Sequence, residues 1–336
     1  MATPTPANFA TFVTNANTMA GQVYQDRPTI FQEFTTTLPV TSSIWETAWT
    51  GRMPKMRLWQ GSRVAHPPGL QTYRVSMQPW ENTYELDRFK MDDDQYGVFY
   101  RMLIDLAEQA KLLPDFQTRD LLENAGAQTG TRQLGWDGLT YFNTAHPVNI
   151  YDTSLSTYSN DFSGGGANIS YSKPGGGTST ILVGGALSPV AIQTLWEYMS
   201  TIQGEDGETL AINASHIIVP SLLKGEAELL LKSMFFAPAA WGSITGQVGA
   251  ADNPIRRFGL EPIVNPYLKQ QTTWYMGDMT RPMKPLLWLN RVSPVMVPRT
   301  QETDPVVFDR HMFQWGEWAR AAPGFGPSWL LCRSGP

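Results

Sequence analysis

The chain has 336 residues, 42% of them hydrophobic, and 25 Lys plus Arg against 30 Asp plus Glu give a net charge of −5. This length and composition allow one large or two intermediate globular domains, and the single cysteine, Cys332, excludes a scaffold held by internal disulfides. The negative charge argues against nucleic-acid binding through a continuous basic surface, although the chain can still enclose nucleic acid. We expect neither secretion nor membrane insertion, because the N-terminus lacks a basic start before an apolar run and no apolar run approaches about 20 residues.

Residues 1–50 are rich in Thr, Pro, Ala and Asn and carry scattered aromatic residues without a sustained period. This pattern predicts an extended N-terminal arm that packs its aromatic side chains on another surface.

The next segment, from Met56 to Trp80, predicts two strands around a turn at Pro67 to Gly69. Tyr73, Val75 and Met77 alternate on one face of the second strand. A two-stranded ribbon is marginally stable by itself, so this hairpin is expected to lie against another surface.

The hairpin is also basic, because no Asp or Glu occurs between Arg52 and Arg74. It is expected either to meet an acidic surface of a partner or to form a solvated face. The candidate contact residues are Arg52, Lys55, Arg57, Trp59, Arg63 and Arg74.

A long amphipathic helix is predicted at about residues 94–125, where apolar residues recur every three or four positions. Asp92 to Asp94 suit its N-terminus, Pro114 should kink or divide it, and Gly126 suits the position just past its end. The acidic triplet lacks a further carboxylate at calcium-loop spacing, so no metal site is predicted.

Residues 150–186 are rich in Gly, Ser, Thr and Asn and are expected to form a surface insertion or flexible loop. Their glycine triplets do not form a phosphate-binding loop, because no Gly-Lys-Ser/Thr follows them.

A compact α/β unit is predicted at residues 187–298, opening with a helix capped by Ser188 with Pro189 at its first position. The strand SHIIVP and the helix SLLKGEAELLLKS follow, with an irregular loop between Phe236 and Arg256. From VVFDRHMFQWGEWAR to PSWLLCR, the tail predicts two strands joined by the turn APGFG.

No pattern in the sequence indicates catalysis. The four histidines are far apart, and none belongs to a zinc-binding or nucleophile motif, so we expect no catalytic, cofactor-binding or metal-binding residues and no enzyme. His146, in the stretch WDGLTYFNTAHP, is expected to shape a turn rather than to act as a general base.

In chain order, the segments WTGRMPKMRLWQGSR, PWENTYELDRFKMDDDQYG, GLTYFNTAHP, TWYMGDMTRPMKPLLW and FDRHMFQWGEWAR resemble the Mu-like major head subunits of tailed bacteriophages. The resemblance runs from about Thr50 to the C-terminus and depends on the order of these motifs. It implies an α+β Hong Kong ninety-seven-like major capsid protein fold with an N-terminal arm, an extended β-hairpin loop, a spine helix, a peripheral domain and an axial domain.

The resemblance also implies a division of the chain. The expected parts are an arm at 1–50, the extended loop at 51–85, a peripheral domain at 86–186, the axial domain at 187–298, and closing strands of the peripheral domain at 299–336. The spine helix at about 94–125 and the Gly-rich insertion at about 150–186 fall within the peripheral domain.

The implied function is that of a self-assembling major capsid protein of a tailed bacteriophage or prophage. Its copies would form pentamers and hexamers of an icosahedral virion shell that encloses double-stranded DNA without sequence-specific binding, assembled in the cytoplasm of the host bacterium. The basic hairpin would lie on a neighbouring copy, near the acidic face of its spine helix. A portal, a separate scaffold protein and a decoration protein are the further expected partners. The alternative is a non-enzymatic carbohydrate- or protein-binding module.

Overall fold

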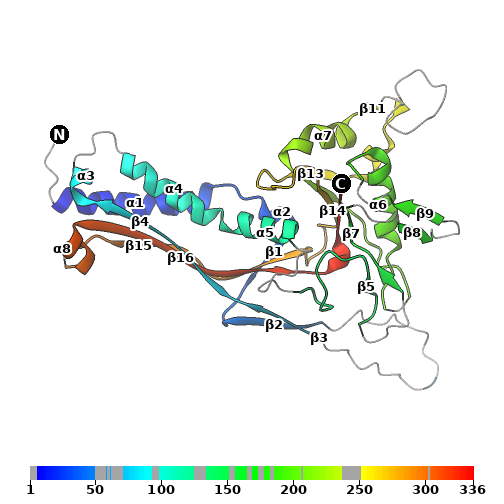
Figure 1. Cartoon of the computed structure of the whole chain (residues 1–336), viewed down its shortest axis with the longest axis horizontal. Helices are drawn as coiled ribbons and strands as arrows, with labels where there is room; N and C mark the ends of the chain where they lie inside the picture. Colours follow the sequence, from blue (N-terminus) through cyan, green and yellow to red (C-terminus); the bar gives the residue numbers. More distant parts are fainter. Residues whose placement is uncertain are drawn as a thin grey trace.

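The structure is a computed structural model that describes residues 6–49, 58, 61, 71–92, 98–124, 134–150, 156–164, 169–172, 178–181, 185–205, 207–236, 251–301 and 303–336. The molecule is elongated (Figure 1). A long sheet with its helices extends to one side, and a second sheet with helices α6 (Pro189–Thr201) and α7 (Lys224–Lys232) forms the other end.

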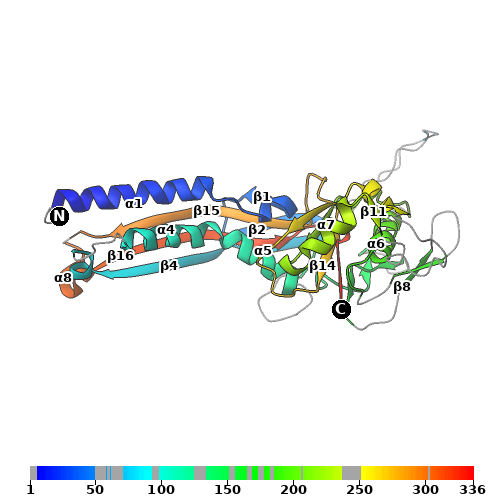
Figure 2. The same ribbon diagram turned by 90° about the horizontal axis from the view of Figure 1, so that it is seen from above.

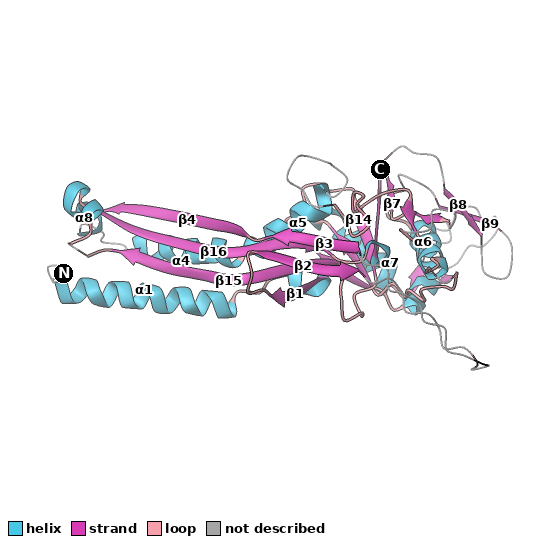
Figure 3. Ribbon diagram, turned by 90° about the horizontal axis from the view of Figure 1, so that it is seen from below, coloured by secondary structure: helices cyan, strands magenta, loops and turns pink. Residues whose placement is uncertain are grey.

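The long sheet has four strands in the order β1-β15-β16-β4, with bounds β1 (Thr35–Pro39), β15 (Leu286–Arg299), β16 (Met312–Phe325) and β4 (Gln78–Asp87). Strand β16 pairs antiparallel with both β15 and β4, and β1 pairs parallel with β15. One face of this sheet carries helices, as Figure 2 shows from above, and the opposite face is seen from below in Figure 3.

The helices associated with the long sheet are α1 (Pro6–Asp26), α2 (Phe31–Phe34), α3 (Arg88–Asp92), α4 (Val98–Lys111), α5 (Leu113–Asn124) and α8 (Pro305–Arg310). The predicted division of the long helix at Pro114 is confirmed, because α4 ends at Lys111 and α5 begins at Leu113. Helix α4 buries Leu103 and Leu106 against the sheet in a cluster with Trp315. The predicted start at 94–97 and the end at Gly126 lie outside the described residues.

The N-terminal segment differs from the prediction, because residues expected as an extended arm form helix α1. The apolar residues of this helix show little helical periodicity because the helix buries little of its surface. Among the α1 side chains that the structure describes, at 14–15 and 17–26, only Ala20 is buried. Tertiary contacts hold the helix instead. The Tyr24 hydroxyl donates to Glu317 Oε1 at 2.6 Å, and Lys111 Nζ donates to the Tyr24 carbonyl oxygen. The expected packing of aromatic residues is confirmed at Phe31 and Phe34, which are buried in the core.

The hairpin prediction is correct for its second strand. Strand β3 (Gln71–Ser76) buries Tyr73 and Val75 and is followed by buried Met77, as the alternation predicts. Its partner is β2 (Ile44–Trp49), which belongs to the segment assigned to the arm. The segment 56–66, predicted as the first strand, lies outside the described residues except for positions 58 and 61.

The second sheet has five strands in the order β13-β10-β14-β17-β7, with bounds β13 (Glu261–Val264), β10 (His216–Val219), β14 (Trp274–Gly277), β17 (Leu331–Gly335) and β7 (Asp161–Ser163). Helices α6 and α7 pack on one face of it. The predicted cap of α6 is confirmed, since the Ser188 side chain accepts a hydrogen bond from the Ala191 N–H at 3.2 Å and Pro189 opens the helix. The other face, through Ile218 and Tyr275, shares a core with Leu287 of the long sheet.

The remaining elements are short. They are β5 (His146–Pro147), β6 (Thr157–Tyr158), β8 (Ile169–Ser172), β9 (Thr178–Ile181), η1 (Ser221–Leu223), β11 (Phe235–Phe236), β12 (Ala251–Asp252), η3 (Pro254–Phe258) and η4 (Ser328–Leu330). The Gly-rich stretch is therefore more than a loop: β8 and β9 pair, β7 joins the five-stranded sheet, and Tyr171 and Ile181 are buried.

Strands near the C-terminus also differ from the prediction. Residues 286–298, expected in the 187–298 unit, belong to the long sheet through β15. Strand β17, expected to pair with the preceding strand of the tail, pairs instead with β14 of the second sheet. The predicted turn APGFG is mostly strand, because β16 continues to Phe325. Its last glycine, Gly326, serves close packing: a Cβ there would collide with the Lys284 carbonyl oxygen. The expected strand at VVFDR is helix α8, opened by Pro305.

Candidate functional site

Only one of the six candidate contact residues lies in the described part of the chain. Arg74 lies on β3 directly opposite Glu46 on β2, and its Nε and Nη2 are each 3.1 Å from a Glu46 carboxylate oxygen. Both side chains remain largely exposed, so the pair is screened and contributes little to stability. Arg74 thus has a partner within its own hairpin. Arg52, Lys55, Arg57, Trp59 and Arg63 lie outside the described residues.

The stretch WDGLTYFNTAHP is part of the core. His146 has no exposed surface; its Nδ1 pairs with the Asp137 carboxylate, and its Nε2 is 3.0 Å from both the Tyr141 carbonyl oxygen and Asn160 Oδ1. The Asn160 amide donates to the Tyr141 carbonyl oxygen at 2.7 Å, which closes the network. Because both ring nitrogens are bonded inside the fold, His146 cannot reach a ligand. The predicted shape-setting role fits this geometry.

The stretch WDGLTYFNTAHP also contacts the strands where the two sheets meet. Trp136 Nε1 donates to the Phe325 carbonyl oxygen at 2.8 Å, and the Tyr141 hydroxyl donates to the Pro285 carbonyl oxygen at 3.0 Å. The rings of Tyr141 and Phe325 stack with centroids 4.5 Å apart. These contacts fix the end of β16 and the start of β15 beside the five-stranded sheet.

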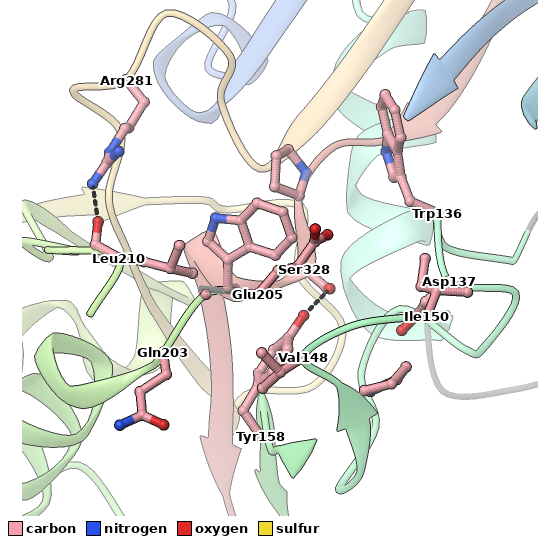
Figure 4. Close-up of a pocket in the computed structure, with 14 residues that line it drawn as sticks. Trp136, Asp137, Val148, Ile150, Tyr158, Gln203, Glu205, Leu210, Arg281 and Ser328 are labelled. Atoms are coloured by element: carbon pink, nitrogen blue, oxygen red, sulfur yellow. Dashed lines mark hydrogen bonds between the residues drawn. The ribbon is translucent and has the colours of Figure 1, made fainter. Parts of the chain in front are cut away.

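A cavity of about 250 Å³ lies beside this network, and Figure 4 shows its lining. Several of its polar groups are engaged by the chain itself: the Tyr158 and Ser328 hydroxyls lie 2.7 Å apart, and Arg281 donates to the Leu210 carbonyl oxygen at 3.0 Å.

The described residues also hold no group of three His, Cys, Asp or Glu side chains that could bind a metal ion. Cys332 is buried, and burial raises the pKa of its thiol, which keeps it in the unreactive protonated form. In the described parts of the chain, no helix has both the length and the apolar character needed to cross a membrane.

Among the described residues, apolar side chains are exposed at several places, including Phe89 of α3, Phe308 of α8 and two surfaces on the long sheet and around α7. On the long-sheet face opposite α4, Val295 is 43% exposed, Val297 45% and Trp318 43%; we call these three residues the sheet patch. Glu81, on β4 opposite Trp318, borders this patch and is exposed. On α4 itself, Asp105 is exposed, whereas Glu108 pairs with Arg27 of α1 at 3.6 Å.

The second exposed surface follows η1, α7 and β11. Leu222 is 69% exposed, Leu229 59%, Met234 59% and Phe235 56%, and we call these four residues the α7 patch. Exposed apolar groups that follow one another along consecutive elements mark an interaction surface more often than isolated ones do. Neither patch could be predicted from the sequence, because exposure depends on which elements the fold leaves uncovered.

A buried carboxylate is a further feature that sequence reasoning missed. Glu317, on β16, is 2% exposed and accepts a hydrogen bond from Tyr24 at Oε1, while its Oε2 has no hydrogen-bond partner among the described residues. Burial raises the pKa of this carboxyl group, and the Tyr24 hydrogen bond partly opposes that rise. In the sequence, the alternation FQWGEW in this strand gives the one available signal, since it places Glu317 on the same face as Phe313 and Trp315.

Comparison with known proteins identifies the family. The sequence profile of the Mu-like prophage major head subunit gpT matches residues 9–171 and 259–334. The Mu-like prophage FluMu major head subunit of Haemophilus influenzae is 26% identical over 295 residues, covering 72% of this chain and 91% of that protein. The major capsid protein of Escherichia phage Mu is 20% identical over 285 residues, covering 69% of this chain and 92% of that protein.

Solved structures show the same fold. The procapsid protein of bacteriophage JBD30 aligns over 99% of this chain and 76% of its own length, with 20% identity and a TM-score of 0.53. The JBD30 capsid protein aligns over 73% of this chain and 94% of its own length, with 19% identity and a TM-score of 0.54. The predicted α+β, Hong Kong ninety-seven-like capsid fold is confirmed. The family match leaves the alternative of a carbohydrate- or protein-binding module without support.

The chain therefore belongs to the family of Mu-like prophage major head subunits, structural and non-enzymatic proteins that form the capsid of a bacteriophage or prophage.

Proposed function

We propose that copies of this chain form pentamers and hexamers through the end of the molecule that carries α7, and that these rings close an icosahedral shell around double-stranded DNA. The observation that carries the proposal is the α7 patch, whose four apolar side chains are between 56% and 69% exposed in the single chain. A ring requires the same patch to meet a different surface of the next copy in succession. Leucine and methionine side chains suit such a contact, because they repack easily when the angle between neighbours changes from a pentamer to a hexamer.

The DNA in this proposal is enclosed without being read. The net charge of −5 gives the chain no general attraction for phosphate, so the shell would contain its DNA through closure and not through sequence-specific contacts. We place assembly in the cytoplasm of the host bacterium.

The basic hairpin would join neighbouring copies. The sheet patch offers an apolar surface, and the exposed carboxylates of Glu81 and Glu85 lie on the adjacent edge strand β4. A hairpin with cations at Arg52, Lys55 and Arg57 complements that border in charge. Since Glu108 of α4 already pairs with Arg27, the sheet surface near β4 is a better acceptor than the acidic face of the helix.

Three further partners belong to this proposal: a separate scaffold protein that guides shell size, a portal at one vertex and a decoration protein on the outer surface. One structure in the JBD30 group is a capsid decorated with minor capsid protein trimers, and its capsid protein aligns with this chain at a TM-score of 0.52. That likeness is the support for a decoration partner here.

The test is assembly of the purified chain, alone and with a candidate scaffold protein from the same genome. Sedimentation velocity and negative-stain electron microscopy should reveal rings, tubes or closed shells above a threshold concentration. A chain that stays monomeric at every concentration, with and without the scaffold, would contradict the proposal. Charge reversal at Arg57 and Arg63 should block shells while leaving the monomer folded; normal shells from that variant would contradict the role of the hairpin.

A further inference from the structure

Glu317 is a buried charge that the single chain leaves incompletely paired. Glu317 is 2% exposed. One oxygen of its carboxylate accepts a hydrogen bond from the Tyr24 hydroxyl at 2.6 Å, and the other oxygen has no hydrogen-bond partner among the described residues. A buried ionised carboxylate without a cation destabilises a protein by its desolvation. A residue that weakens the single chain in this way is a candidate for a role in binding.

The surroundings of Glu317 fit a cation. Together with Trp80, Asn82, Gln109 and Pro294, it lines a cavity of about 200 Å³ between the end of α4 and the edge strand β4. The Trp80 indole offers an aromatic surface, and its Nε1 is already engaged by the Ala321 carbonyl oxygen at 3.0 Å. An aromatic side chain and a carboxylate in the lining of one cavity suit a lysine ammonium or an arginine guanidinium, through a cation–π contact and an ion pair. Asn82, directly opposite Glu317 in the sheet, adds a polar side chain on the same face.

We propose that this cavity receives a lysine or arginine side chain from the basic segment 52–63 of a second copy of the chain. The segment offers Arg52, Lys55, Arg57 and Arg63, with no acidic residue to pair with them inside it. This inference rests on the proposed function, because it adds to the contact of the hairpin along the edge strand β4 an acceptor on the α4 side of that strand. The incoming cation neutralises Glu317 in the assembly, and the single chain lacks that neutralisation.

The proposal predicts opposite effects of one substitution on the single chain and on the particle. Glu317→Gln keeps an acceptor oxygen for Tyr24 and removes the charge. Because burial raises the pKa of Glu317 in the folded chain, the unfolded chain releases this proton first, and the ionised group costs stability as the pH rises above its ordinary value of 4.5. The variant monomer should therefore unfold at a higher temperature than wild type at pH 7 and at the same temperature at pH 4. Its particles, in contrast, should show about a tenfold or larger loss in the association constant of the contact.

A double-mutant cycle identifies the donor. Gln replaces each of Arg52, Lys55, Arg57 and Arg63 in turn, in the wild-type and the Glu317→Gln backgrounds, and the dissociation of assembled particles is followed against denaturant. One of the four should lose most of its effect once Glu317 is already Gln, because a residue in contact with Glu317 is not additive with it. Glu226→Gln, at an exposed glutamate on α7, is the matched control and should be additive with all four. Additivity of all four with Glu317→Gln would overturn the proposal.

Cross-linking within the particle tests the geometry directly. A photoreactive phenylalanine analogue replaces Asn82 at the cavity, and nitrogen-14 and nitrogen-15 copies are mixed before assembly. The expected product joins Asn82 to a peptide containing residues 52–63, with mixed isotopes that prove two different copies. Particles whose cross-links avoid that peptide, or join it only within one copy, would overturn this inference and leave the shell function intact. Failure to form particles at all would refute the proposed function and this inference together.

Discussion

The α7 patch gives the most direct test of the ring contact. Replacing Leu229 by Gln removes the apolar side chain but keeps a residue of similar size and good helix propensity. Full burial of a leucine side chain stabilises by about 1.5–3 kcal/mol. In the single chain 59% of Leu229 is exposed. Burying this exposed part in an interface therefore stabilises the contact by about 1–2 kcal/mol. The association constant of the contact should therefore fall by about five- to twentyfold, at 1.4 kcal/mol for each tenfold.

The assay is sedimentation velocity over a concentration series at a fixed concentration of scaffold protein, and the quantity compared is the threshold for rings or shells. The monomer of Leu229→Gln should keep its unfolding temperature, because the exposed side chain contributes little to the core. Glu228→Gln is the matched control, since it introduces the same residue into the same helix at an exposed polar position. The reasoning is refuted if Leu229→Gln and Glu228→Gln assemble at the same threshold as wild type.

Three further substitutions test the fold that supports these surfaces. His146→Ala leaves the Asp137 carboxylate and the Asn160 amide without their ring partner, so it should lower the free energy of unfolding by about 2–4 kcal/mol in a urea titration; an unchanged midpoint would show that the network is dispensable. Tyr24→Phe removes the hydroxyl donor to Glu317. A half-buried hydrogen bond to a charged group stabilises by about 1.5 kcal/mol, so its loss should speed amide hydrogen exchange in α1 by about tenfold. Unchanged exchange would mean that other contacts hold the helix. Gly326→Ala should destabilise by more than about 2 kcal/mol, because its Cβ meets the Lys284 carbonyl oxygen, whereas Gly225→Ala on the exposed face of α7 should stabilise by about 0.5–1 kcal/mol; equal effects in thermal unfolding would contradict the packing argument.

The family profile matches the long sheet and, in the second sheet, strands β7, β13 and β14. The family profile does not match residues 172–258, which contain α6, β10 and α7. The α7 patch lies in that unmatched stretch, so its proposed role depends on exposure in this chain and on no relative. A ring interface that differs between relatives is expected where the same fold builds particles from diverged sequences.

Local signals in the sequence determined several elements by themselves. Ser188 and Pro189 specify the start of α6 because a cap and a fixed backbone angle act within one turn, and Pro114 divides the long helix because it lacks an N–H. The alternation at Tyr73 and Val75 gave the buried face of β3 in the same way. The joint order of several motifs gave the family, although each motif alone is weak.

Only the tertiary structure decided features that depend on partners distant in the sequence. Helix α1 has little periodicity of its own and is held by Glu317, which lies 293 positions away from Tyr24. Strand β15 joins the long sheet because it pairs with β16, and β17 joins the second sheet because it pairs with β14. Apolar strands can pair in more than one way, so the sequence alone does not specify these partners. The burial of Glu317 follows from the same pairing, because a strand residue faces the core or solvent only once its sheet and its covering helix are set. Sequence therefore fixed the local elements, and long-range contacts fixed the surfaces through which the chain meets its neighbours.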